Sequence, residues 1–154
     1  MSSDSPDRII FFDGYCVVCN NLVDFLLTRD SGGQFSFAAL QSSSAEATLP
    51  KHGYPVQTIQ SLDNVVYLQA GKIKIKSDAI LSIMADLGGA YRLFRLLYVV
   101  PRFFRNRIYD EFARNRYGWF GKNEVCRIPT RKRCTNAWIN LVWDHQFTDR
   151  YINM

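Results

Sequence analysis

Two cysteines separated by two residues, Cys16 and Cys19, stand between an apolar run and a stretch with helical periodicity. The run from Ile9 to Phe12 is short and continuous, as expected for a strand buried on both faces. A Cys-x-x-Cys pair on a strand-to-helix turn places a thiol beside the unpaired N–H groups and the partial positive charge of a helix N-terminus. Both features stabilise a thiolate, which is the nucleophile in disulfide exchange. The pattern therefore predicts a redox-active dithiol.

The position of each cysteine predicts its role. Cys16 would start the helix and lie closest to solvent, so we expect it to attack a substrate disulfide. Cys19 lies one turn further, on the apolar side of the helix, and would resolve the mixed disulfide. Asp13 precedes Cys16 by three residues. Its carboxylate could cap the helix by accepting a backbone N–H, or take a proton from Cys19 during resolution, and the residues leave both roles open.

The chain has 154 residues, of which 47% are hydrophobic and 21% charged, as in a single globular domain. No stretch approaches the roughly 18 apolar residues of a membrane span, and the polar N-terminal segment does not resemble a signal peptide. We therefore expect a cytoplasmic protein whose cysteines are kept reduced. In that compartment a Cys-x-x-Cys pair is more typical of catalysis or metal binding than of a structural disulfide.

The pattern of apolar residues predicts a strand-helix-strand-helix-strand-strand-helix order over residues 8–89. A strand at 8–12, a helix at 16–29 and a strand at 34–40 imply a parallel pair, because a helix joins the two strands. A hairpin of strands 65–68 and 72–76 adds antiparallel pairing, and a helix from Ala79 to Leu87 follows, with Ser77 and Asp78 as its cap. The expected fold is therefore a thioredoxin-like mixed β-sheet flanked by helices, with the dithiol after the carboxyl end of the first strand.

Residues 90–154 are predicted to form an all-helical extension and tail of the same domain, which spans 1–154 with its core at 8–89. An amphipathic stretch from Tyr91 to Val100 is interrupted at Pro101 and continues to Tyr117. The apolar side chains of the second stretch are expected to pack against the sheet or the first helix: Phe103, Phe104, Ile108, Phe112 and Tyr117.

The motif Asp13-x-x-Cys16-x-x-Cys19 directly after a strand resembles the DCC family of thioredoxin-like thiol-disulfide oxidoreductases. Ser77-x-Ala79-Ile80 and the block at 101–129 also resemble that family, so the similarity covers roughly residues 8–130. The resemblance implies a thioredoxin-like fold, a redox role for Cys16 and Cys19, and a place beside the dithiol for residues 114–117. Asn106 departs from the Asp of many members. Leu62-Asp63-Asn64 also lacks the proline that thioredoxins place opposite the dithiol.

The predicted function is disulfide exchange without an organic cofactor, with electrons supplied by another dithiol. One alternative is a zinc site, because four thiolates could bind the metal: Cys16, Cys19, Cys126 and Cys134.

A second alternative comes from charge. The first 77 residues hold six Lys or Arg against seven Asp or Glu, and the remaining 77 hold thirteen against seven. The arginines of the extension could contact a membrane surface or an anionic partner, although no nucleic acid is expected. They could equally be solvated side chains whose stems cover aromatic rings. They are Arg92, Arg95, Arg102, Arg105, Arg107, Arg114 and Arg116.

Overall fold

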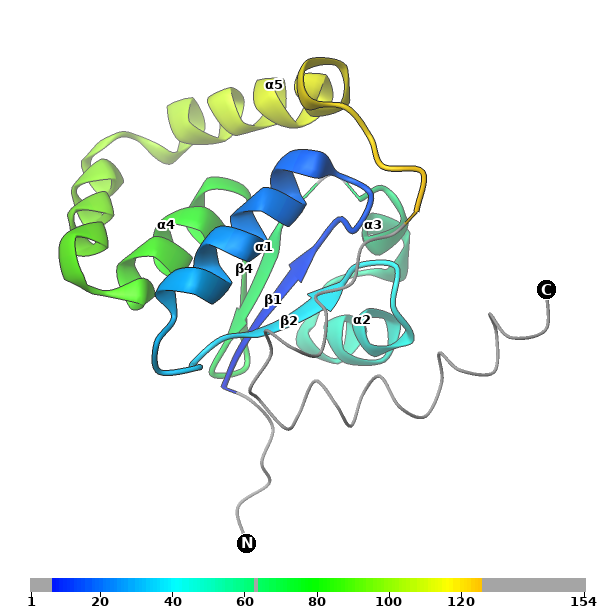
Figure 1. Cartoon of the computed structure of the whole chain (residues 1–154), viewed down its shortest axis with the longest axis horizontal. Coiled ribbons are helices and arrows are strands. Elements are labelled where there is room, and N and C mark those ends of the chain that lie inside the picture. Colours follow the sequence, from blue (N-terminus) through cyan, green and yellow to red (C-terminus); the bar gives the residue numbers. More distant parts are fainter. Residues whose placement is uncertain (1–6, 63, 126–154) are drawn as a thin grey trace, which may run out of the picture.

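The computed structural model describes residues 7–62 and 64–125, in which a four-stranded sheet is covered by helices on both faces (Figure 1). The strand order is β2-β1-β3-β4. The strands are β1 (Arg8–Phe12), β2 (Ser36–Ala39), β3 (Val66–Gln69) and β4 (Lys72–Ile75). β1 pairs with β2 in parallel and with β3 antiparallel, and β4 forms an antiparallel edge. The predicted mixed sheet and its antiparallel hairpin are confirmed.

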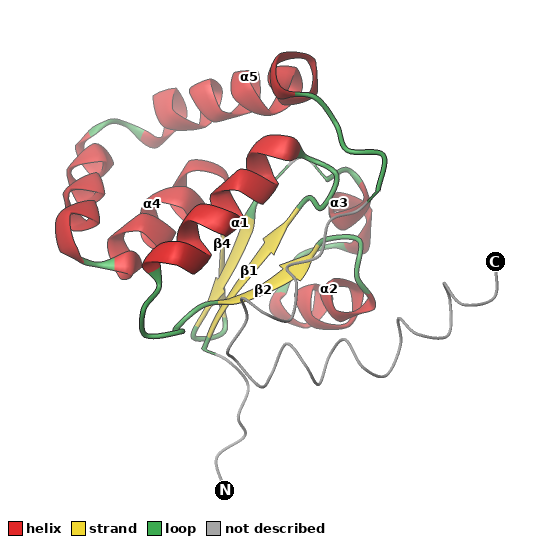
Figure 2. Cartoon of the chain, in the orientation of Figure 1, coloured by secondary structure: helices red, strands yellow, loops and turns green. Residues whose placement is uncertain are grey.

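Successive residues of β1 enter two separate cores, which explains its continuous apolar run. Ile10 and Phe12 pack beneath α1 (Val17–Arg29) and α4 (Lys76–Leu87), and Phe11 packs on the opposite face. The opposite face is covered by three short helices, α2, η1 and α3 (Figure 2). They span Ser43–Thr48, Leu49–His52 and Val56–Gln60, and the last was not predicted. The observed architecture is that of a thioredoxin-like α/β fold.

The chain then leaves the core through an arch of two helices, η2 (Gly89–Val99) and α5 (Arg102–Phe120). Pro101 separates them because its ring restricts the backbone and removes a donor N–H, and the backbone there is not helical, with φ −53° and ψ 138°. Figure 1 shows η2 beside α4, and α5 crossing above α1 and α4. The helical extension is thus confirmed as far as residue 120, whereas residues 126–154 lie outside the described part.

The predicted cap of α4 was wrong. The helix begins at Lys76, and no side chain caps it. Ser77 Oγ instead donates to Asn106 Oδ1 at 2.6 Å, and the Asp78 carboxylate pairs with Arg105 at 2.8 Å. The side-chain oxygens of Ser77 and Asp78 therefore bind residues of α5. These tertiary contacts compete with capping of α4 by the same oxygens.

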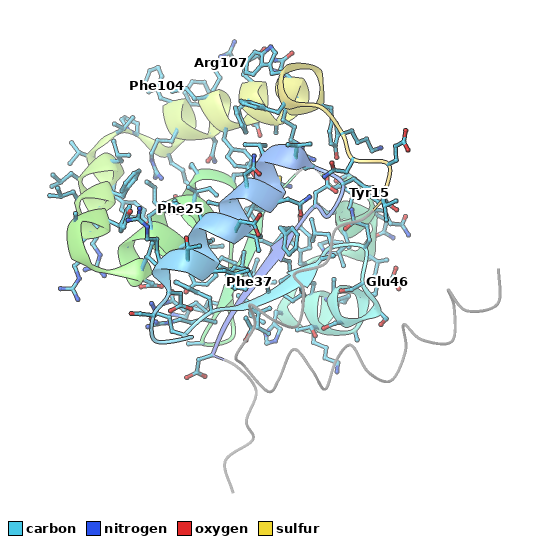
Figure 3. The ribbon with its side chains drawn as sticks, viewed as in Figure 1. Tyr15, Phe25, Phe37, Glu46, Phe104 and Arg107 are labelled. Atoms are coloured by element: carbon cyan, nitrogen blue, oxygen red, sulfur yellow. The ribbon has the colours of Figure 1, made fainter. Side chains whose placement is uncertain are left out.

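The apolar side chains of α5 only partly follow their prediction. Phe112 and Tyr117 are partly buried, but Phe103, Phe104 and Ile108 are 69%, 57% and 71% exposed. Figure 3 shows Phe104 projecting from α5 away from the sheet. Only one side of the helix meets α1 and α4, which leaves these three residues on the other. None of the described helices is both long and apolar enough to cross a bilayer.

Candidate functional site

The two cysteines occupy the first turn of α1. Cys16 is the N-cap residue, with extended backbone angles of φ −77° and ψ 118°, and its sulfur accepts the Cys19 backbone N–H at 3.3 Å. Both side chains are free thiols. A sulfur that accepts one of the otherwise unpaired N–H groups of a helix start is stabilised as a thiolate. The strand-turn-helix setting predicted from the sequence is confirmed.

The two thiols differ in acidity because they interact with each other. The Cys19 thiol, hydrogen-bonded to the neighbouring sulfur, lowers the pKa of Cys16 to about 7. The Cys19 backbone N–H and the charge of Arg116 act in the same direction, against the effect of burial. The same thiol–thiol hydrogen bond, together with burial, raises the pKa of Cys19 far above its ordinary value. The dithiol therefore loses its first proton from Cys16, while Cys19 keeps its own.

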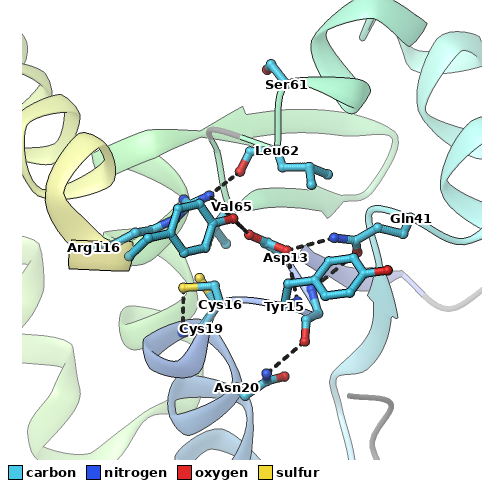
Figure 4. Close-up of polar contacts among 12 residues, drawn as sticks. Asp13, Tyr15, Cys16, Cys19, Asn20, Gln41, Ser61, Leu62, Val65 and Arg116 are labelled. Carbon is cyan, nitrogen blue, oxygen red and sulfur yellow. Dashed lines mark hydrogen bonds and ion pairs between the residues drawn. The ribbon is translucent and has the colours of Figure 1, made fainter. Parts of the chain in front are cut away.

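Asp13 is buried beside the dithiol and accepts four hydrogen bonds (Figure 4). Its Oδ1 accepts the Tyr15 backbone N–H at 3.0 Å and Gln41 Nε2 at 2.7 Å. Its Oδ2 accepts Arg116 Nη2 at 3.2 Å and the hydroxyl of Tyr117. Asp13 does accept a backbone N–H, but in the turn and not in the helix, because Cys16 itself occupies the N-cap position. Of the two roles left open for Asp13, the capping of α1 is therefore wrong.

Arg116 joins three separate segments at this site. It is only 4% exposed, and its Nη2 also donates to the Leu62 carbonyl at 2.6 Å. Leu62 has a left-handed backbone, with φ 55°, and belongs to the Leu62-Asp63-Asn64 segment that lacks the thioredoxin proline. Arg116 thus ties α5 both to this segment and to the buried carboxylate of Asp13. A buried ion pair is costly to break, because the remaining charge is left without compensation.

Two amides hold the turn that leads from β1 to the cysteines. Gln41 Oε1 accepts the Gly14 backbone N–H at 3.2 Å, and Asn20 Nδ2 donates to the Gly14 carbonyl at 2.9 Å. Gln41 follows β2, the strand parallel to β1, so it lies at the same end of the sheet as Gly14, which follows β1. Neither Gln41 nor Asn20 was predicted from the sequence. The parallel pairing contained a signal for Gln41, because it places the carboxyl ends of both strands together.

The expectation that Cys16 lies closest to solvent was wrong, because its side chain is 0% exposed and that of Cys19 is 6% exposed. The segment Gly121–Asn123, which we call the strap, covers the turn. Asn123 N–H donates to the Tyr15 carbonyl at 2.8 Å, and Lys122 forms an isolated antiparallel bridge with Cys16. Local sequence does not reveal such a cover, since the strap lies more than 100 residues away.

The structure separates the arginines of the extension into different roles. Arg116 reaches the site together with Tyr117, as the family resemblance implied for this block. Arg114 instead pairs with Glu111 at 2.7 Å on an exposed face, so it does not line the dithiol. Arg102 and Arg105 both pair with Asp78. A single basic face therefore does not include all seven arginines.

The zinc alternative involves two residues, Cys126 and Cys134, that lie outside the described part of the chain. Within residues 7–62 and 64–125, no group of three or more His, Cys, Asp or Glu side chains could hold a metal ion. Cys16 and Cys19 alone supply two of the four ligands that a structural zinc site needs.

Comparison of the sequence with known proteins identifies its family. The family model for DCC1-like thiol-disulfide oxidoreductase matches residues 10–122. The uncharacterised protein YuxK of Bacillus subtilis is 38% identical over 129 residues, covering 84% of this chain and 92% of YuxK. A DCC family protein of Arabidopsis thaliana, described as chloroplastic, is 34% identical over 121 residues, covering 78% and 69% of the two chains. No solved structure matches. The chain therefore belongs to the DCC1-like thiol-disulfide oxidoreductase family.

Proposed function

We propose that this protein catalyses thiol-disulfide exchange with Cys16 as the nucleophile and Cys19 as the resolving thiol. The observation that carries the proposal is the placement of the Cys16 sulfur at the N-cap of α1. There it accepts the Cys19 N–H and has a pKa of about 7. A thiol with a pKa near ambient pH combines a substantial thiolate fraction with high nucleophilicity.

The reaction would proceed in two balanced steps. The Cys16 thiolate attacks one sulfur of the substrate disulfide, forms a mixed disulfide and releases the other sulfur as a thiolate. Cys19 then loses its proton and attacks the Cys16 sulfur, which forms the Cys16–Cys19 disulfide and releases the second substrate thiol. Two electrons pass to the substrate, and a second dithiol returns the enzyme to its reduced form. This scheme requires no organic cofactor.

Asp13 is our proposed acceptor for the Cys19 proton in the second step. Its negative charge raises the pKa of both thiols, which indicates that the carboxylate is within electrostatic reach of the dithiol. Asp13→Asn keeps the shape of the side chain but removes the basic oxygen. We expect resolution to slow, so that the mixed disulfide accumulates during turnover. Unchanged decay of the mixed disulfide would remove Asp13 from this role.

The test of the proposed function is a pair of matched cysteine variants assayed for insulin reduction with dithiothreitol as the electron donor. Cys16→Ser should abolish exchange, because serine is not a nucleophile toward disulfides. Incubated with insulin in the absence of dithiothreitol, which would itself cleave the mixed disulfide, Cys19→Ser should retain the first step and trap a mixed disulfide that mass spectrometry detects at Cys16. A normal rate of exchange by Cys16→Ser would contradict the proposal.

The physiological partner in this scheme is a protein or small-molecule disulfide together with a reducing dithiol. We propose a reducing compartment such as the cytoplasm for the chain, where the dithiol would stay available as thiols. Its Arabidopsis relative is described as chloroplastic.

A further inference from the structure

A second face of the dithiol opens on an apolar cavity of about 550 Å³. Four helices form its walls: α1, α4, η2 and α5. Cys19 lies at its edge with Val18 and Leu22 of α1, and Phe94, Leu97 and Phe112 contribute from the arch. The volume lies within the range of about 300–1,000 Å³ that is typical of small-molecule sites. Cys16 does not line this cavity, so Cys19 is the thiol that an occupant would contact.

One polar group in this wall lacks a partner. Arg116 lines the cavity beside Cys19, and its Nε–H is buried without a hydrogen-bond partner among the described residues. Its Nη2, in contrast, is engaged by Asp13, Leu62 and Tyr117. A buried donor without an acceptor is costly, and such groups are exceptions that need an explanation. A bound ligand with an oxygen acceptor would supply the missing partner.

We propose that this cavity is a subsite for the substrate, and that it binds an uncharged apolar group carrying a carbonyl oxygen. The apolar part fills the space between α1, α4 and the arch, and the carbonyl accepts Arg116 Nε–H next to Cys19. Charged groups are disfavoured, because the apolar walls cannot solvate them. The inference rests on the proposed function, since exchange at the dithiol defines what counts as the substrate.

Binding can be measured separately from exchange with Nile red, an uncharged apolar dye that carries a carbonyl and fluoresces in apolar surroundings. Ala113 lines the cavity, so Ala113→Phe places a ring inside it. We expect Ala113→Phe to weaken Nile red binding about tenfold or more, because the added ring occupies the space that the dye needs and forcing both into it is unfavourable. The matched control, Ala47→Phe at an exposed position of α2, should bind as the wild type does. Equal binding by both variants would overturn the proposal.

The outer face of the arch also exposes apolar side chains, so the dye needs a second control. Leu96 is 66% exposed and does not line the cavity. Leu96→Ser should leave Nile red binding unchanged. If Leu96→Ser weakens binding and Ala113→Phe does not, the dye binds the outer face and the cavity proposal is wrong.

The role of Arg116 Nε is tested by two competitors of the same shape. 9-Fluorenone carries one carbonyl, and fluorene has a methylene group in its place. Because a hydrogen bond from a charged donor is among the stronger ones, we expect fluorenone to displace Nile red from the wild type at about tenfold lower concentration. Equal displacement by the two compounds would overturn the assigned role of Arg116.

Exchange assays then distinguish this inference from the proposed function. One substrate is the disulfide of N-acetyl-cysteinyl-phenylalaninamide, which is uncharged and carries both rings and carbonyls. The other is 2-hydroxyethyl disulfide, which is too small to fill the cavity. Ala113→Phe should raise KM for the first substrate only. Unchanged KM for both would overturn the subsite and leave exchange intact, whereas absence of exchange by the wild type with either would overturn the proposed function itself.

Discussion

In the sheet core, the rings of Phe11, Phe12 and Phe37 are 0–2% exposed, whereas Phe103 and Phe104 on α5 are more than half exposed. The core is held by apolar burial on both faces of the sheet. The arch is joined to it by the Phe25–Tyr91 ring contact and by a set of ion pairs, which are those of Lys76 with Asp110, of Arg102 and Arg105 with Asp78, and of Arg116 with Asp13. The same arch supplies Arg116 and Tyr117 to the dithiol, so its main contribution is to the site rather than to the core.

This difference predicts how the two regions respond to loss of an aromatic ring. Phe37→Ala should reduce the free energy of unfolding by about 3–5 kcal/mol, because it leaves a cavity beneath α1. Phe103→Ala should change it by less than about 0.5 kcal/mol, since most of that ring is in solvent. Urea denaturation of both variants measures the contrast. Comparable losses would show that the exposed face of α5 is covered in the protein.

The second expected effect concerns the one fully buried ion pair between the two regions within the described residues. Arg116→Met leaves the Asp13 carboxylate buried without its positive partner, at a cost of about 3 kcal/mol or more. Arg114→Met, two residues away on the same helix, removes only an exposed pair with Glu111 and should cost less than about 1 kcal/mol. Denaturation midpoints compare the two. Equal costs would mean that other donors fully compensate Asp13.

The third contrast tests the strap. Gly121 has φ 86° and ψ 173°, a backbone conformation that essentially only glycine adopts, so Gly121→Ala adds about 1–3 kcal/mol of strain where α5 ends. We expect the strap to open more often and Cys16 to be alkylated by iodoacetamide about tenfold faster. Gly118→Ala inside α5 is the matched control, because helical alanine is favoured over glycine. Site-resolved mass spectrometry measures both, and no acceleration in Gly121→Ala would show that the strap does not limit access.

The smallest expected effect is a shift along the pH axis. In the wild type, alkylation of Cys16 should rise with pH and be half-maximal near pH 7, because only the thiolate reacts. Cys19→Ala removes the thiol whose hydrogen bond contributes most to that low pKa, so the midpoint should move toward the ordinary value of 9.0. Cys19→Ser retains a hydroxyl donor and should move it less. An unchanged midpoint in Cys19→Ala would assign the low pKa to the helix start and Arg116 alone.

Much of the core could be predicted from the sequence because its signals are local. The apolar run of β1, the β3–β4 hairpin and the periodicity of α1 each depend on neighbours in the chain, and all were confirmed. The helix α3 was missed because its five residues are too few to show periodicity. The cap of α4 was assigned wrongly because Ser77 and Asp78 bind residues of α5, which are distant in the sequence and brought close only by folding.

By itself, the sequence determined the dithiol and its position at a helix start, because spacing and periodicity are properties of a short segment. Only the tertiary structure decided what surrounds it. Arg116 meets Asp13 across 103 positions of the chain, and the strap buries Cys16 from a similar distance. The cavity beside Cys19 likewise exists only where four helices meet. Such contacts depend on how elements pack, and packing follows from the sum of many weak interactions that no single motif encodes.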